Sequence, residues 1–76
     1  DVYAGQWRHD KRHGHGRKEW ADGRVYEGNW FDNARFGEGV YTWPDGSYYS
    51  GSWFDNKRHG RGKMVWRDGS HFDGVW

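Results

Sequence analysis

The side chains that could do chemistry in this chain are histidines, serines and carboxylates, so their spacing is the first observation to interpret. His9, His13 and His15 lie close together and could gather a metal ion, but a similar segment further along the chain keeps only His59. A zinc site requires about four ordered ligands, and this spacing does not supply them. We therefore expect no metal site and no cofactor.

The residue types give no more support to a catalytic site than to a metal site. The four serines show no evident partnership with a histidine and an aspartate. Most carboxylates recur as turn residues, where Asp has a local hydrogen-bonding role. The Gly-x-Gly at Gly14 and Gly16 lies within a strand-like pattern, whereas a phosphate-binding loop joins a strand to a helix. We predict that the chain is not an enzyme and has no small-molecule substrate.

Composition limits the chain to one small domain with an aromatic core. Of its 76 residues 33% are hydrophobic and 21% aromatic, and there are seven Trp but no Leu or Ile. The net charge of +1 argues against a nucleic-acid partner. Cysteine is absent, which excludes disulfides and fits a cytoplasmic protein. No apolar run approaches the length of about 20 residues that a membrane-spanning helix needs.

The sequence repeats with a period of 23 residues. The equivalent positions are Tyr3, Tyr26, Tyr49 and Phe72; Gly5, Gly28, Gly51 and Gly74; Trp7, Trp30, Trp53 and Trp76; Gly16, Gly39 and Gly62; Trp20, Trp43 and Trp66; and Gly23, Gly46 and Gly69. We place repeats at 3–25, 26–48 and 49–71, with a partial fourth repeat at 72–76. Because the chain starts and stops within the pattern, we expect an excerpt of a longer protein.

Each repeat predicts two short strands. The Tyr-x-Gly-x-Trp motif alternates with period two, so Tyr26, Gly28 and Trp30 share one face while Glu27 and Asn29 face water. The segment after it alternates in the same way. Because the connections are short, we expect an all-β fold, an elongated single-layer antiparallel meander of stacked hairpins. Two strands per repeat predict a rise of about 10 Å per repeat, and about 30 Å for three.

Two kinds of turn should alternate along this meander. Trp43-Pro44-Asp45-Gly46 predicts a three-residue hairpin loop in which glycine takes a positive φ, and Gly23 and Gly69 are equivalent to Gly46. The other connection is expected to be longer, at 8–13, 31–36 and 54–59. Its central residues tolerate a left-handed conformation; they are Asp10, Asn33 and Asn56.

These motifs resemble the MORN repeat (membrane occupation and recognition nexus) from Tyr3 to Trp76. The matching motifs are YAGQW with HGHG, YEGNW with FGEG, and YSGSW with HGRG. The chain departs from the family pattern in having Asp10, Asn33 and Asn56 where glycine is usual, and Phe36 where His13 and His59 keep the usual histidine.

The resemblance implies an open sheet curved into a groove and a non-catalytic module for assembly or targeting. Such repeats occur in junctophilins, ciliary radial spoke proteins, plant phosphatidylinositol phosphate kinases and a histone methyltransferase, where any activity belongs to another domain. The resemblance also suggests a cytoplasmic location, either in a cytoskeletal or ciliary assembly or at the periphery of a membrane.

The aromatic residues are the first candidate site. Each ring is either a core residue or, because a single sheet has no second layer to cover it, open to a protein partner. The candidates are Tyr3, Trp7, Trp20, Tyr26, Trp30, Tyr41, Trp43, Tyr49, Trp53 and Trp66. We single out Tyr41, since Lys18 and Met64 occupy its column in the other repeats and stacking should not hold it.

Basic residues of the longer connections are the second candidate site. They are Lys11, Arg12, Arg35, Lys57, Arg58 and Arg61, and stacking should align Arg12, Arg35 and Arg58 along one edge. They are either solvated charges or a site for an anionic ligand, with Asp10, Asp32 and Asp55 weakening the second reading. The leading hypothesis is a protein-interaction scaffold that binds a partner or its own copies; the alternative is an anionic phospholipid membrane.

Glycines are expected to have structural roles. Gly23, Gly46 and Gly69 supply the turns. Glycine within a strand weakens it, so we interpret Gly5, Gly28, Gly51 and Gly74 as sockets, each receiving a ring from the next strand.

This interpretation predicts that Gly28→Val lowers the melting temperature more than Glu27→Val, because only the first substitution fills a socket. Thermal unfolding followed by near-UV circular dichroism measures both. Equal melting temperatures would show that the glycine has no such role.

Overall fold

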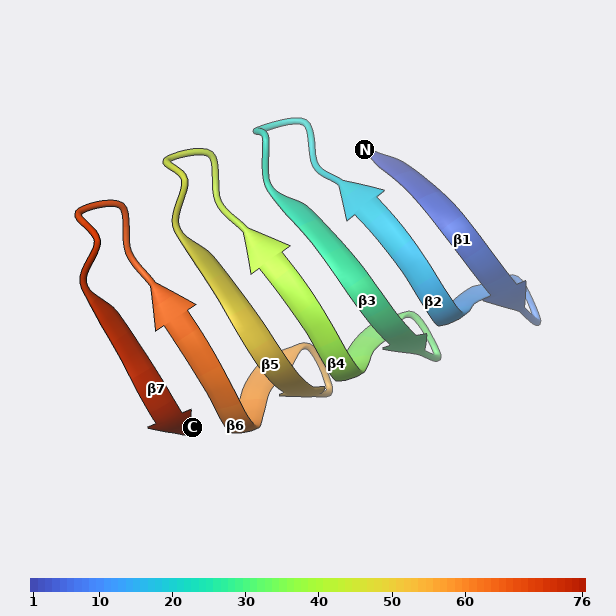
Figure 1. The fold of residues 1–76 in the computed structure, drawn as a ribbon. Coiled ribbons are helices and arrows are strands. Elements are labelled where there is room, and N and C mark those ends of the chain that lie inside the picture. Colours follow the sequence, from blue (N-terminus) through green and yellow to red (C-terminus); the bar gives the residue numbers. More distant parts are fainter.

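A single antiparallel sheet makes up the whole molecule (Figure 1). The computed structural model describes residues 1–76. The strands are β1 (Val2–Arg8), β2 (Lys11–Glu19), β3 (Val25–Phe31), β4 (Ala34–Thr42), β5 (Tyr48–Phe54), β6 (Lys57–Val65) and β7 (His71–Val75). They lie in the order of the sequence, which confirms the predicted all-β, single-layer meander. No helix long and apolar enough to cross a membrane is present.

The sheet is one layer thick and elongated. Its extents are 40 × 26 × 13 Å, and all seven strands belong to one sheet, so no second layer packs on it. The longest extent exceeds the expected value of about 30 Å, which counted only the spacing between strands.

Alternating residues divide the sheet into two faces. In β3, Tyr26, Gly28 and Trp30 are buried while Glu27 and Asn29 are exposed, as period two requires. We call the side that carries Tyr26 and Trp30 the aromatic face and the other side the opposite face. The core lies on the aromatic face and comprises Tyr26, Trp30, Tyr41, Tyr49, Trp53 and Met64.

The three-residue hairpin loops form as predicted. The Gly46 amide donates to the Trp43 carbonyl at 3.0 Å, and the Trp43 amide donates to the Ser47 carbonyl at 2.9 Å. Gly46 has a φ of 94°. The Asp45 carboxylate accepts a hydrogen bond from the Ser47 amide at 2.8 Å, and the Ser47 hydrogen bonds hold the pKa of that carboxyl below its usual range.

The other connections are shorter than expected. β3 and β4 pair as far as Phe31 and Ala34, so only Asp32 and Asn33 form the turn. Both have positive φ, 53° and 72°, the pattern of a type I′ turn. The six-residue connections at 8–13, 31–36 and 54–59 are therefore wrong, because their outer residues belong to strands. The left-handed conformations of Asp10, Asn33 and Asn56 are confirmed.

A row of glycines crosses the entire sheet, with one residue in each strand. Cross-strand pairing joins Gly5, Gly16, Gly28, Gly39, Gly51, Gly62 and Gly74. The Tyr26 ring lies over Gly39, where an added Cβ would come within 2.6 Å of Tyr26 Cε1. The Tyr26 hydroxyl donates to the Asn29 carbonyl at 2.9 Å, which holds the ring across the row.

This geometry corrects the socket assignment. The glycine that receives the Tyr26 ring is Gly39, and Tyr3 and Tyr49 lie over Gly16 and Gly62 in the same way. Gly28 is required for a different reason. A Cβ there would lie 2.6 Å from the Glu38 carbonyl oxygen and nearer still to the Gly39 Cα.

Two glycine substitutions distinguish a glycine required for space from a glycine required for its backbone conformation. Gly39→Ala should destabilise the fold by roughly 3 kcal/mol or more, because the methyl group would displace the Tyr26 ring. Gly46→Ala should cost only about 1 kcal/mol, since a Cβ there meets nothing within 4 Å and only the positive φ is unfavourable. Urea unfolding measures both free energies. A larger cost at Gly46 would contradict the assigned role of Gly39.

Candidate binding surfaces

Five of the ten candidate rings are buried in the core. They are Tyr26, Trp30, Tyr41, Tyr49 and Trp53. Trp53 meets the Tyr49 ring edge-on at 5.1 Å and, across β4, the Tyr26 ring of the preceding repeat at 5.5 Å. Its indole NH donates to the Gly39 carbonyl at 3.2 Å. Burial raises the pKa of the Tyr26 hydroxyl, because ionisation is unfavourable in this apolar setting.

Tyr41 is not open to a partner, although the different residues at its equivalent positions, Lys18 and Met64, led us to expect so. It is 4% exposed, and its ring contacts those of Trp43 at 4.6 Å, Trp20 at 5.4 Å and Trp53 at 5.7 Å. The reason is its register, which places it between Tyr26 and Tyr49 on the neighbouring strands. A partner could reach it only by displacing its neighbours.

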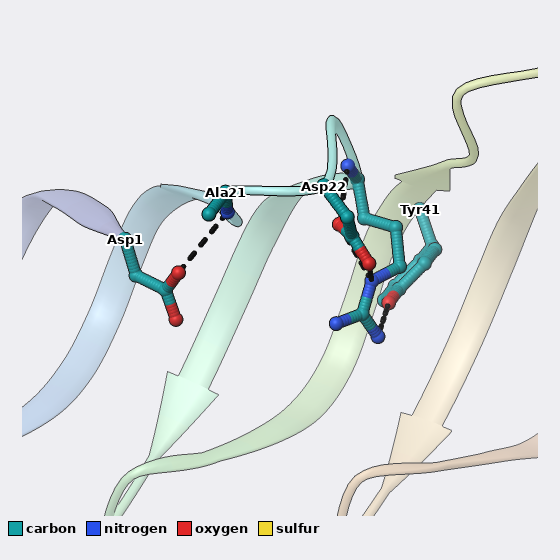
Figure 2. A network of polar contacts seen from close by, with 5 residues as sticks. Asp1, Ala21, Asp22 and Tyr41 are labelled. Carbon is teal, nitrogen blue, oxygen red and sulfur yellow. Dashed lines mark hydrogen bonds and ion pairs between the residues drawn. The ribbon is translucent and has the colours of Figure 1, made fainter.

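Cations cover one of the partly exposed indoles. Arg24 lies over Trp20 with its Cζ 5.1 Å from the ring centroid, and Lys18 Nζ lies 4.9 Å away. Figure 2 shows Asp22 and Tyr41 near this guanidinium, which donates to Asp22 Oδ2 at 2.8 Å and to the Tyr41 hydroxyl at 3.1 Å. The hydrogen bonds from Arg24 lower the pKa of the Asp22 carboxyl.

The equivalent indoles lack this covering. Ser47 and Ser70 replace Arg24 in the later repeats, and no cation lies over Trp43 or Trp66. Trp43 is half-buried although a repeat flanks it on either side. Trp66 is 42% exposed and borders a hollow of about 380 Å³ beside the preceding hairpin loop. We call Trp20, Trp43 and Trp66 the indole row.

The two remaining candidate rings lie in β1. Tyr3 is half-buried and packs against the core, whereas Trp7 is 58% exposed. Trp7 meets Tyr3 edge-on at 4.8 Å.

Three of the candidate basic residues pack on the aromatic face. The guanidinium carbons of Arg12, Arg35 and Arg58 lie 4.7, 4.8 and 4.6 Å from the centroids of Trp30, Trp53 and Trp76. These arginines are aligned as expected, but Arg12 and Arg35 are half-buried and stack on the indoles. Burial lowers the pKa of the Arg35 guanidinium.

Arg35 also joins two repeats. Its Nε and Nη2 donate to Asn56 Oδ1 and the Asn56 carbonyl at 3.2 and 2.9 Å. The Arg35 backbone amide donates to Asn56 Oδ1 at 2.9 Å, and the Asn56 backbone amide donates to the Arg35 carbonyl at 3.1 Å. Arg12 and Asn33 form the same set. Asparagine in the left-handed turn is therefore a link between repeats.

Strand alternation places Lys11, Lys57 and Arg61 on the opposite face, although Lys57 also borders a hollow lined by Trp43 and Trp53. The six candidates therefore do not form one basic edge. Neighbouring strand residues such as Lys11 and Arg12 point to opposite sides, which the sequence-based expectation overlooked. Lys11 Nζ pairs with Asp32 at 3.1 Å.

The opposite face carries a row of rings that the sequence pattern did not predict. His13, Phe31, Phe36, Phe54 and His59 contact one another in that order, with centroid separations of 5.3, 5.6, 5.4 and 5.6 Å. Phe31 and Phe54 are more than half exposed. The repeated Trp-Phe pairs at 30–31 and 53–54 could have predicted this row. Adjacent strand residues face opposite sides, so a Phe after each core Trp must lie on the opposite face.

The histidines near the N-terminus do not converge on a metal site. His13 packs against Phe31, and His15 Nε2 lies 3.9 Å from Glu27 Oε2. No group of three or more His, Cys, Asp or Glu side chains is placed to hold a metal ion.

The fold and its interlocking rings define a single-layer β-repeat protein. The sequence model of the MORN repeat matches residues 3–23, 26–48 and 49–71. The chain therefore belongs to the MORN-repeat family, as its motifs suggested. Repeats of this family have protein-binding or membrane-binding roles. A comparison with curated proteins found no match.

Arg35→Lys should destabilise the protein by about 1–2 kcal/mol, because lysine cannot make both hydrogen bonds to Asn56 while stacking on Trp53. The control Arg61→Lys, on the exposed opposite face, should change stability by less than about 0.5 kcal/mol. Urea unfolding of both variants measures the difference. Equal effects would mean that Arg35 contributes only its charge.

Proposed function

We propose that the protein is a non-catalytic interaction module that binds a segment of a protein partner along the indole row. The observation that carries this proposal is the state of Trp43, which is half-buried within the array and has no cation over its ring. Large aromatic side chains that remain open on a rigid surface are typical interface anchors.

The spacing of the row favours a repeating partner. One indole per repeat gives a separation of about 10 Å, the rise of two strands. Apolar side chains at i and i+7 of a helix lie on one face and are about 10.5 Å apart. A segment with this spacing would place successive anchors against Trp43 and Trp66.

The basic residues give less support to an anionic membrane. Arg12 and Arg35 are engaged with tryptophan and asparagine, and Lys11 is paired with Asp32. The charges that remain are divided between two faces. A flat anionic surface could therefore meet only part of them at one time.

Selection from a library of random 12-residue peptides tests the proposal. Peptides that bind should lose at least about tenfold in affinity for Trp43→Ala, because the substitution removes a central anchor. The aromatic control Tyr48→Ala lies on the opposite face and should leave binding unchanged. Thermal unfolding verifies that both variants fold. Peptides indifferent to Trp43→Ala would contradict the proposal.

Vesicle sedimentation provides the second arm of this test. The protein should remain in solution with both neutral and phosphoinositide-containing vesicles at near-physiological salt. Sedimentation with anionic vesicles only, abolished by high salt and by Lys57→Ala with Arg61→Ala, would favour the membrane instead. Removing Arg12, Arg35 and Arg58 would be a poorer test, because it would confound binding with the loss of packing on the indoles.

A further inference from the structure

Two equivalent hollows lie on the opposite face, one repeat apart. The first, of about 420 Å³, is lined by Arg8, His9, Lys11, His13, Phe31 and Asp32. The second, of about 340 Å³, is lined by Phe31, Asp32, Ala34, Phe36, Phe54 and Asp55. Each residue of the second set follows its counterpart in the first by 23 positions. The fold therefore builds the same hollow twice with different side chains.

The first hollow contains its own cation and the second does not. Lys11 Nζ lies 3.1 Å from Asp32 Oδ1. The corresponding positions in the second hollow are Ala34 and Asp55, so the lysine is replaced by a methyl group. Asp55 is exposed and forms no ion pair. Its carboxylate lacks the partner that Asp32 has.

The walls of the second hollow suit a lysine side chain. Phe36 replaces the histidine found at His13 and His59, and its ring contacts Phe31 at 5.6 Å and Phe54 at 5.4 Å. The methylene stem of lysine packs on apolar surface, and its ammonium is attracted to ring faces and carboxylates. No basic residue lines this hollow, and two aspartates do. Its charge is thus opposite to that of the first hollow.

We propose that the hollow over Ala34 receives a lysine side chain from a protein partner, which supplies to Asp55 the ion pair that Lys11 gives to Asp32 within the chain. Exposed apolar residues beside the lysine would contact Phe31 and Phe54. This site lies on the face away from the indole row, so it neither requires nor replaces binding there.

NMR titration with N-acetyl-lysine N-methylamide tests the site. Amide signals of residues 34–36 and 54–55 should shift and saturate, with an affinity about fivefold higher than for the Nε-acetylated probe, which carries no charge. Asp55→Asn should weaken binding by a similar factor, and asparagine tolerates the left-handed turn at this position. The control Asp73→Asn makes the same charge change on β7 and should have no effect.

Ala34→Lys provides an internal test of the same geometry. The new lysine should pair with Asp55, raise the melting temperature slightly and abolish binding of the probe. A second probe, a 12-residue peptide with one lysine between leucines, should bind more tightly than the single amino acid because it adds contacts to Phe31 and Phe54.

Four results would overturn the proposal. Equal affinity for the charged and acetylated probes, or binding unchanged by Asp55→Asn, would show that the probe forms no ion pair with Asp55. Shifts that do not saturate would show that no site exists. A peptide that binds no better than the free lysine derivative would indicate a site for small ammonium ions in place of a protein partner. None of these results depends on Trp43.

Discussion

The structure depends on one steric constraint, which is that a tyrosine ring must lie flat across bare backbone. Tyr26 can cross Gly39 only because neither that residue nor its cross-strand partner Gly28 has a side chain. The ring then presents its edge and face to tryptophans on both sides, Trp30 at 5.0 Å and Trp53 at 5.5 Å. A single sheet without Leu or Ile obtains its core in this way, by packing large rings over a row of glycines.

The same arrangement ties each repeat to the next. Trp53 reaches across β4 to the Tyr26 ring and donates its indole NH to the Gly39 carbonyl. Asn56 reaches back to Arg35 from the following turn. Stability is therefore a sum of repeat terms and interface terms between neighbours, as in other repeat proteins. The arginines contribute to these interfaces, which explains why their alignment does not create a basic binding edge.

Local pattern predicted the backbone well and the surfaces poorly. The 23-residue period, the alternation around Trp30 and the Pro44-Asp45-Gly46 turn are encoded in adjacent residues, and each prediction is confirmed. Tyr41 was misjudged because its burial comes from strands on both sides, which a repeat column does not show. The connection at 31–36 was drawn too long because Phe31 and Ala34 reveal their strand character only when paired. The row of rings from His13 to His59 also depends on contacts between repeats.

The hollows of the opposite face have a consequence for how such arrays diverge. Each hollow draws its lining from two adjacent repeats, and its residues take no part in the tyrosine and glycine packing on the other side. Exchanging lysine for alanine at position 34, or histidine for phenylalanine at position 36, alters one hollow and leaves the scaffold intact. Gene duplication followed by a few substitutions could thus generate a series of sites with different ligand preferences along one sheet. Selection could act on each junction almost independently of the others.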